Sequence, residues 1–311
     1  MVNVKTLKIN KKNYKKTLKK PFTKDNIEIY NENGLDLLKR TNNDSINLVL
    51  TDPPYVISNP NTGLHQISLK VKSFRADGTM TKTEKDWSSY KKPEEWEKFM
   101  NERNIPKQKQ EKVLEKYKDN YLKFGTIYGS KYGVTTDYGK WDSKFTLEKL
   151  QLFVNEYYRV LKNGGSIIIF FDIWKLESLK AILETAGFKQ IRFIEWIKTN
   201  AQPLNSTVNY LTNNREVALT AVKGSKPTFN SKYDHGIYEF PIAGGKDRFH
   251  PTQKNVLLFE KLIKKHSNEN DTVMDTFLGS GTTALACHKT NRKFIGSELD
   301  KTFFQKIKRR F

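Results

Sequence analysis

The sequence predicts an α/β fold in which helices cover both faces of a doubly wound, mostly parallel sheet of seven strands. Short apolar runs alternate with amphipathic helical segments along most of the 311 residues, which is the pattern of alternating strands and helices. Two of the runs lead into loops of acidic, proline or glycine residues, as strands do at the carboxyl edge of such a sheet. A chain of this length can hold one large domain with insertions. The expected strands are Ile27–Tyr30, Ile46–Thr51, Ser166–Phe171, Ile191–Trp196, Glu216–Val222, Thr272–Asp275 and Lys293–Ser297.

The second expected strand ends in the sequence Thr51-Asp52-Pro53-Pro54-Tyr55. Consecutive prolines fix the backbone φ angle, so the carboxylate, the neighbouring carbonyls and the aromatic ring are held in one arrangement. Such a loop at the carboxyl end of a strand suits an enzyme that acts on a planar nitrogenous substrate. The alternative is a simple Pro-Pro turn in which Asp52 caps the next element, because a short match needs structural context.

Two segments in the middle of the chain have the periodicity of amphipathic helices. Apolar residues fall on one face of residues 146–161 and again on one face of residues 174–186. Gly187 follows the second segment and is suited to end it. We expect both helices to pack in the core.

A second loop follows the strand Thr272–Asp275, where the sequence runs through Gly279 and Gly281 into a helical segment. Glycines let the backbone turn tightly, and the exposed amides at a helix start favour a carboxylate or phosphate. Glu298 stands at the tip of the next strand, about 20 residues after the first glycine, where an acidic side chain accepts hydrogen bonds from ribose hydroxyls. The loop therefore indicates a nucleotide-like ligand with an anionic end.

The charge balance points to a polyanionic partner. The chain has 55 lysines and arginines against 34 acidic residues, a net charge of +21, and nucleic acid fits this excess better than a membrane does. No apolar run has the roughly 20 residues of a membrane-spanning helix, and no signal peptide is recognisable, so we expect a cytoplasmic protein. The single cysteine, Cys287, excludes a disulfide framework and speaks for a packing role rather than a metal site.

Two segments differ in composition from the rest. Residues 1–20 contain eight lysines and no acidic residue, as expected for a solvated basic arm. Residues 80–123 are rich in lysine, glutamate and aromatic residues, and we interpret about 57–143 as an inserted helical lobe.

Taken together, the two loops resemble those of the amino-group DNA methyltransferases that use S-adenosylmethionine. The resemblance is to the permuted, or beta, group, in which the Asp-Pro-Pro-Tyr loop precedes the cofactor loop, and it covers nearly the whole chain. It implies a Rossmann-like catalytic domain over 21–311 and a target-recognition segment at about 223–249, with the lobe sharing in DNA contact. Other matching landmarks are Leu161–Gly165, Trp196–Lys198 and His250–Lys254.

The resemblance assigns catalysis to Asp52, Pro53, Pro54 and Tyr55. An exocyclic amine is a poor nucleophile, so the Asp52 carboxylate and the Pro53 carbonyl would bind its two hydrogens and stabilise the developing positive charge. The target nucleotide would be flipped out of the duplex, with Tyr55 stacked on its base. No metal is implied, because a sulfonium is already an activated methyl donor.

The cofactor-binding residues are likewise implied by the resemblance. Thr252 and Lys254 would lie at the rim, Glu298 would bind the ribose, and Asn33 with Asp36 would meet the cofactor adenine. The methionine end would be lined by Asp275, Phe277, Gly279, Ser280, Gly281 and Thr282. The chain departs from the family pattern at Asn33, which replaces an acid, and at Thr276 and Asn255, which stand where proline is common.

The expected activity is sequence-specific N6-adenine methylation of double-stranded DNA, as part of a restriction-modification system. N4-cytosine methylation is the alternative within the class, and a catalytically silent DNA-binding protein is the alternative outside it. A homodimer and a cognate restriction endonuclease remain open as partners. We expect His250 and Trp196 to be structural.

Overall fold

The structure, a computed structural model, describes residues 20–55, 83–124, 127, 145–201, 211–245, 248–250 and 252–311. The chain divides into two compact units. The sheet unit comprises residues 1–55 and 145–311, and the helical unit comprises residues 56–144. The predicted basic arm, apart from Lys20, and large parts of the predicted lobe lie outside the described residues.

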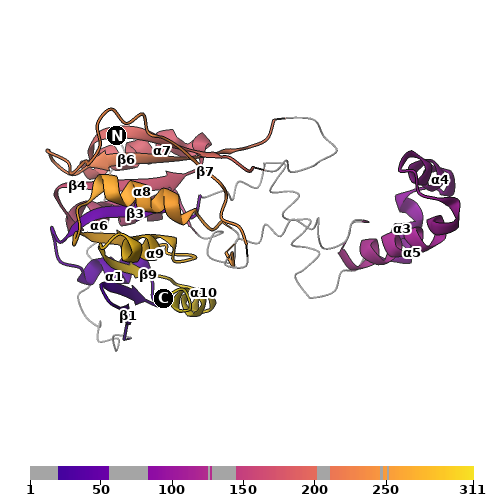
Figure 1. Cartoon of the computed structure of the whole chain (residues 1–311), viewed down its shortest axis with the longest axis horizontal. Helices are drawn as coiled ribbons and strands as arrows, with labels where there is room; N and C mark the ends of the chain where they lie inside the picture. Colours follow the sequence, from indigo (N-terminus) through magenta and orange to yellow (C-terminus); the bar gives the residue numbers. More distant parts are fainter. Residues whose placement is uncertain are drawn as a thin grey trace. The chain divides into compact units, whose positions relative to one another are not determined.

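The described part of the sheet unit is built on one sheet of nine strands, in the order β1-β2-β9-β8-β3-β4-β6-β5-β7 (Figure 1). All seven expected strands are present. The expected number of strands is wrong, because each edge of the sheet carries one further strand. The added strands are β1 (Phe22–Lys24) and β7 (Ile237–Phe240). Both are short, with three and four residues, so neither has an apolar run long enough to mark a strand in sequence. The other strands are β2 (Ile27–Tyr30), β3 (Ile46–Thr51), β4 (Leu161–Phe171), β5 (Lys189–Lys198), β6 (Arg215–Val222), β8 (Thr272–Asp275) and β9 (Lys293–Ser297).

Strand direction decides which loops meet. The five strands β2, β9, β8, β3 and β4 run parallel to one another. Strand β6 is antiparallel to both β4 and β5, and β7 is parallel to β5. The carboxyl ends of β3, β8, β9, β5 and β7 therefore share one edge with the amino end of β6. We call this the carboxyl edge.

Helices form a layer on each face of the sheet. Helices α8 (Val256–His266), α9 (Thr282–Lys289) and α10 (Lys301–Lys308) share one apolar core with alternate residues of the strands, among them Leu48 and Leu50. Helices α1 (Gly34–Arg40), α6 (Leu147–Val160) and α7 (Leu176–Ala186) contact one another in the order α1, α6, α7. The two expected middle helices are confirmed as α6, capped by Thr146, and as a short 3-10 turn followed by α7, which Gly187 ends with φ of 99°.

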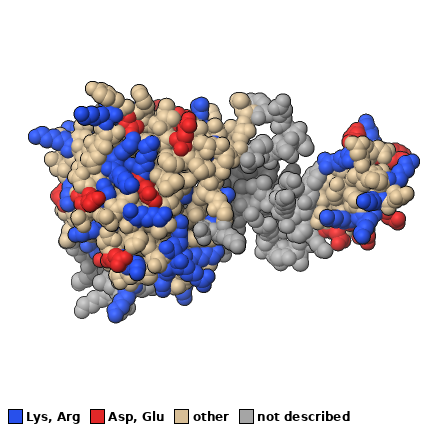
Figure 2. All heavy atoms as spheres, viewed as in Figure 1, with Lys and Arg blue, Asp and Glu red and all other residues tan. Residues whose placement is uncertain are grey.

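The described residues of the helical unit form α3 (Glu84–Tyr90), α4 (Pro93–Glu102) and α5 (Lys107–Phe124). Aromatic rings fill the space between them, with ring centroids 5.0 Å apart for Trp87 and Trp96 and 4.6 Å apart for Tyr90 and Tyr121. Residues 83–124 carry 11 basic and 9 acidic side chains. Figure 2 accordingly shows blue and red interspersed on this unit, whereas blue predominates on the visible face of the sheet unit. Within the described parts of the chain, no helix is both long and apolar enough to cross a membrane.

Candidate active site

Asp52 lies at the carboxyl edge, directly after β3, with 19% of its side chain exposed. Its Oδ1 accepts a hydrogen bond from the Tyr55 hydroxyl at 2.7 Å, and its Oδ2 lies 2.9 Å from the Lys254 ammonium. Pro53 and Pro54, between the two loop residues, are buried. Asp52 is thus held by two side chains. The simple-turn alternative, in which Asp52 caps the next element, concerns residues after Tyr55 that lie outside the described residues.

Lys254 links Asp52 to Glu216 and, through Glu216, to Lys198, two residues that the sequence did not identify as site residues. Its ammonium lies 2.5 Å from Glu216 Oε2 at the start of β6, and it donates to the Tyr55 hydroxyl at 3.2 Å. The other oxygen of Glu216 pairs with Lys198, at the end of β5, at 2.8 Å. Four groups of alternating charge therefore run from Lys198 through Glu216 and Lys254 to Asp52. We call these four residues the ion-pair chain.

Burial and pairing set the protonation of the ion-pair chain. Burial raises the pKa of Asp52 above its usual value, although Lys254 opposes the shift. Burial alone would lower the pKa of Lys254, but the carboxylates of Asp52 and Glu216 raise it well above the usual value. Burial would likewise raise the pKa of Glu216, but Lys254 and Lys198 hold it below the usual value. Asp52 is therefore the member best suited to take up a proton.

Tyr55 is anchored at three points. Its ring meets Phe171 edge-on with centroids 5.8 Å apart, its carbonyl accepts a hydrogen bond from Lys175 at 3.2 Å, and its hydroxyl donates to Asp52. Burial, followed by the Asp52 charge, raises the pKa of the hydroxyl well above its usual range. The stacking of Tyr55 on a flipped base stays a prediction.

Asp275, at the end of β8, is 3% exposed and makes only internal contacts among the described residues. Its Oδ1 accepts from the Thr51 hydroxyl at 2.7 Å and from the Phe277 amide at 3.0 Å, and its Oδ2 accepts from the Thr283 hydroxyl at 2.6 Å. Burial raises its pKa to about 6. Asp275 thus ties the glycine turn to the strand that precedes Asp52, a role that Thr51 completes and that the sequence did not reveal.

Glu298 shapes the glycine turn from the end of β9. Its two carboxylate oxygens accept the amides of Gly279 and Asp300, each at 2.7 Å. Burial raises its pKa to about 7, although both amides oppose the shift. Gly281 has a φ of 80°, and a Cβ there would lie 2.8 Å from Ile307 of α10. Close helix packing therefore requires glycine at this position.

The segment before α8 closes the turn from the other side. The Thr282 hydroxyl donates to the Lys254 carbonyl at 3.3 Å and also bonds Ser280 at 2.9 Å. The amide and hydroxyl of Thr252 lie 3.3 and 3.1 Å from Nδ1 of His250. Burial, together with Lys254, lowers the pKa of His250 to about 4, which favours the neutral form of its ring. Its structural role stays a prediction.

Other predicted residues have structural partners. The Asn33 side chain caps α1 by accepting the Leu35 amide at 2.9 Å, and Asp36 lies in the first turn of that helix. Phe277 packs on Phe153 with ring centroids 4.6 Å apart. Asn255, which replaces a proline, caps α8. Trp196 and Cys287 are buried, as expected for packing residues, and the Trp196 indole donates to the Phe240 carbonyl at 2.8 Å.

Thr276, which also stands where the family often has proline, is buried beneath the turn. Its hydroxyl lies 2.5 Å from that of Tyr157 on α6. The departure therefore replaces a rigid residue with one that bonds the neighbouring helix layer.

The predicted recognition segment, 223–249, divides in two. Asn230 donates to the Lys264 and Ser267 carbonyls at the end of α8, both at 3.0 Å, so this part lies at the sheet edge opposite Asp52. In contrast, β7 ends at the carboxyl edge, where Ile242 donates to the Asn200 side chain at 2.7 Å. Only the part after β7 lies on the same edge as the ion-pair chain.

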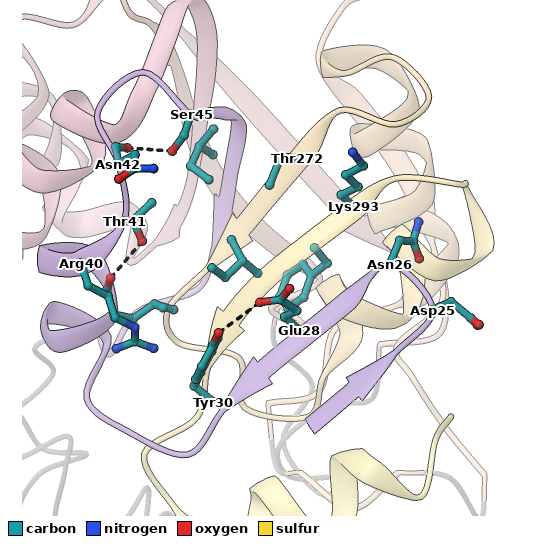
Figure 3. A pocket seen from close by; sticks show the side chains of 14 residues that line it. Asp25, Asn26, Glu28, Tyr30, Arg40, Thr41, Asn42, Ser45, Thr272 and Lys293 are labelled. Carbon is teal, nitrogen blue, oxygen red and sulfur yellow. Dashed lines mark hydrogen bonds between the residues drawn. The ribbon is translucent and has the colours of Figure 1, made fainter. Parts of the chain in front are cut away.

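A pocket of roughly 690 Å³ lies beside α1, among residues at the starts of β2, β3, β8 and β9 (Figure 3). It contains none of the predicted site residues. Several of its polar groups bond one another or the nearby backbone, as Tyr30 does with Glu28 at 3.1 Å and Ser45 with the Asn42 carbonyl at 2.7 Å. The pocket is therefore separate from the candidate active site.

Comparisons with known proteins identify relatives of this chain and solved structures that share its fold. A family model described as DNA methylase, of the N6/N4 methyltransferase group, matches residues 126–309. The type II methyltransferase M2.LlaDCHI of Lactococcus lactis subsp. cremoris is 31% identical over 196 residues, which are 57% of this chain and 72% of the relative. Two solved structures share the fold. The M1.HpyAVI–SAM complex has a TM-score of 0.55 at 24% identity, covering 92% of this chain and 100% of its own. The cytosine-N4-specific PvuII DNA methyltransferase has a TM-score of 0.61 at 17% identity, covering 94% of this chain and 89% of its own.

Proposed function

The chain belongs to the DNA methylase family of the N6/N4 group, and we propose that its target is the exocyclic N6 amine of adenine in double-stranded DNA. It is an S-adenosylmethionine-dependent DNA methyltransferase. The observation that carries the proposed chemistry is the Asp52 carboxylate, which lies at the carboxyl edge and already holds a cationic nitrogen, that of Lys254, at 2.9 Å. A site that binds an ammonium suits an amine that becomes positively charged during methylation.

Asp52 performs two tasks in this proposal. Its carboxylate accepts a hydrogen of the target amine, while the Pro53 carbonyl accepts the other, so the nitrogen lone pair is directed toward the methyl group. The cofactor, when bound, supplies an electrophilic methyl group on a sulfonium. The amine then carries a positive charge and releases a proton. The raised pKa of Asp52 suits it to receive that proton and pass it to solvent.

The donor set of the glycine turn fits S-adenosylmethionine. Glu298 offers carboxylate oxygens for ribose hydroxyls, and each of these oxygens can accept a second hydrogen bond beside the backbone amide that it already binds. Thr252 provides a hydroxyl for an amino-acid carboxylate, and the half-buried Phe277 provides an aromatic surface. The Lys254 ammonium, predicted at the rim, is instead held by Asp52 and Glu216. Asp275 acts indirectly by fixing the turn.

The cofactor adenine is assigned to the start of α1. The Asn33 oxygen caps the helix, so its amide nitrogen and the Asp36 carboxylate are the groups that we assign to the adenine.

Base flipping brings the amine to Asp52, and Tyr55 changes its contacts to stack on the base. We assign DNA recognition to the segments that leave the carboxyl edge: residues 56–144, 199–214 and 241–251. The first of these ranges is the helical unit. Its described helices carry nearly balanced charge, 11 basic and 9 acidic side chains over residues 83–124, which favours contacts with base edges or DNA shape over binding of phosphates.

Adenine is preferred over cytosine because the loop begins with Asp, whereas Ser is commoner in the N4-cytosine enzymes of this group. The match to a type II methyltransferase supports a role in restriction-modification beside a cognate endonuclease. DNA as substrate is consistent with a cytoplasmic location, and a homodimer is compatible with the family. Both amines share the same N–C=N geometry, so N4-cytosine methylation is the second candidate.

The test is product analysis. The purified protein is incubated with unmethylated DNA and isotope-labelled S-adenosylmethionine, and the digested nucleosides are identified by mass spectrometry. We expect labelled N6-methyladenine. Labelled N4-methylcytosine would mean that the same mechanism acts on cytosine instead of adenine. Cofactor binding without any labelled nucleoside would contradict a DNA substrate.

A further inference from the structure

Both oxygens of the Asp52 carboxylate are engaged within the protein, which bears on how the target amine reaches it. Tyr55 donates to Oδ1 at 2.7 Å and Lys254 lies 2.9 Å from Oδ2. Lys254 also contacts Glu216 at 2.5 Å, so a single ammonium bridges two carboxylates. Its side chain is 6% exposed, so little water is available to replace either contact.

We propose that the Lys254 ammonium holds the place of the target amine beside Asp52 and shifts onto Glu216 when that amine binds. This makes Glu216 a positioning residue for methyl transfer, acting through Lys254 without touching the substrate. The inference rests on the proposed function, because it takes a DNA amine as the group that replaces the ammonium.

The two nitrogens are alike in what they require. A protonated lysine and an amine that is gaining a methyl group both carry positive charge and both present N–H donors to Asp52. On binding, the neutral amine needs a carboxylate oxygen that the ammonium occupies. Once the amine gains a methyl group, the two like charges at a few ångströms repel strongly where water is scarce. The ammonium therefore has to move away from the reacting nitrogen.

Glu216 provides the destination at minimal displacement. Its Oε2 is already in contact with Lys254, so the ammonium only has to release Asp52 and need not cross the site. Lys198 holds the other oxygen of Glu216 at 2.8 Å, which fixes the carboxylate and keeps it ionised. The rings of Tyr55 and Phe170 lie 5.6 and 5.5 Å from the ammonium and give it a further favourable surface.

The charge count of the ion-pair chain predicts how variants combine. Two lysines balance two carboxylates, so Glu216→Gln leaves Lys254 with Asp52 as its only carboxylate partner among the described residues. Lys254→Met instead leaves Asp52 and Glu216 facing each other, which favours a proton on Asp52. The double variant removes one charge of each sign and leaves Asp52 open to the amine.

The test is a double-mutant cycle on the full chain. We expect Glu216→Gln to lower kcat by about 100-fold, in the range seen when one electrostatic group is removed from an active site. The KM for DNA and the Kd for S-adenosylmethionine should stay within about threefold, since the loss concerns the transition state. The double variant should be faster than either single variant. A double variant with a kcat no higher than that of the faster single variant would overturn the proposal. A Glu216→Gln enzyme with normal kcat would overturn it as well.

Glu195→Gln is the matched control. Glu195 lies three residues before Lys198 on β5 and pairs with Arg215 at 3.3 Å, outside the ion-pair chain. This variant should keep normal kcat. If the wild-type protein itself transfers no methyl group to DNA, the proposed function fails before the inference is tested.

If the Glu216→Gln variant does not fold, an NMR measurement on the wild-type protein tests the proposal instead. The Lys254 side-chain nitrogen is observed by NMR in complexes with DNA that carries either adenine or purine, which lacks the amine, at the target position. We expect its signal to change with adenine and not with purine. Equal signals in the two complexes would contradict displacement by the amine.

Discussion

Asp52 and Asp275 are two aspartates at the ends of neighbouring, paired strands, β3 and β8, yet they serve different purposes. Burial raises the pKa of both. Asp52 faces the Lys254 ammonium and is 19% exposed on its side chain. Asp275 is enclosed by two hydroxyls and an amide. An aspartate with a charged, exchangeable partner can exchange it for a substrate, whereas one satisfied by fixed neutral donors holds the loops together.

The Thr51 hydroxyl connects the two. It precedes Asp52 in the chain and donates to Asp275, so the position of the Asp52 loop depends on the glycine turn. A change at Asp52 should therefore affect chemistry alone, and a change at Asp275 should affect stability first.

The largest expected effect is that of Asp52→Ala. Removal of the amine acceptor should lower kcat by at least about 10³-fold. Cofactor affinity and Tm should change little, because Lys254 keeps Glu216 as its partner. Methyl transfer, S-adenosylmethionine binding and thermal unfolding check this together. Near-normal turnover would exclude Asp52 as the amine acceptor.

Asp275→Ala should show the opposite pattern. It leaves the Thr51 and Thr283 hydroxyls and the Phe277 amide without their acceptor, and we expect a loss of about 2–4 kcal/mol in unfolding free energy. Denaturant unfolding measures the loss. Asp275→Asn is the control, because its side chain can still bond these groups and should cost less. If Asp275→Ala had native stability, the assignment of Asp275 as a loop tie would be wrong.

Glu298→Gln should change how stability depends on pH. The pKa of Glu298 is raised to about 7 in the folded protein, from a usual value of 4.5. The folded state therefore binds the proton more tightly, and stability falls as pH rises from about 4.5 to 7. The variant should lack this fall, worth about 3 kcal/mol. Denaturant melts of both proteins across this range provide the comparison, and parallel curves would contradict the raised pKa.

The smallest expected effect is that of Asn230→Ala. Loss of its bonds to the end of α8 should cost about 1 kcal/mol, while the methylated DNA sequence stays the same, since Asn230 lies at the edge opposite Asp52. Thermal unfolding and mapping of the methylated sites measure both. Altered site choice would return residues 224–235 to the recognition surface.

The sequence by itself determined the features that are contiguous in the chain. The apolar runs placed all seven internal strands, and the Asp52 loop and the glycine turn indicated both the chemistry and the family. These succeed because strand pattern, turn chemistry and a motif of neighbouring residues are local properties.

Only the tertiary structure decided which distant residues share the site. Glu216 reaches Lys254 because β6 runs against its neighbours and starts at the edge where β3 ends. Asp275 holds the two loops together by accepting a hydrogen bond from Thr51, which lies on another strand. The edge strands β1 and β7 also depend on pairing, since neither has an apolar run of its own. Sheet order and strand direction follow from packing between residues far apart in the chain. A local sequence pattern therefore does not predict them.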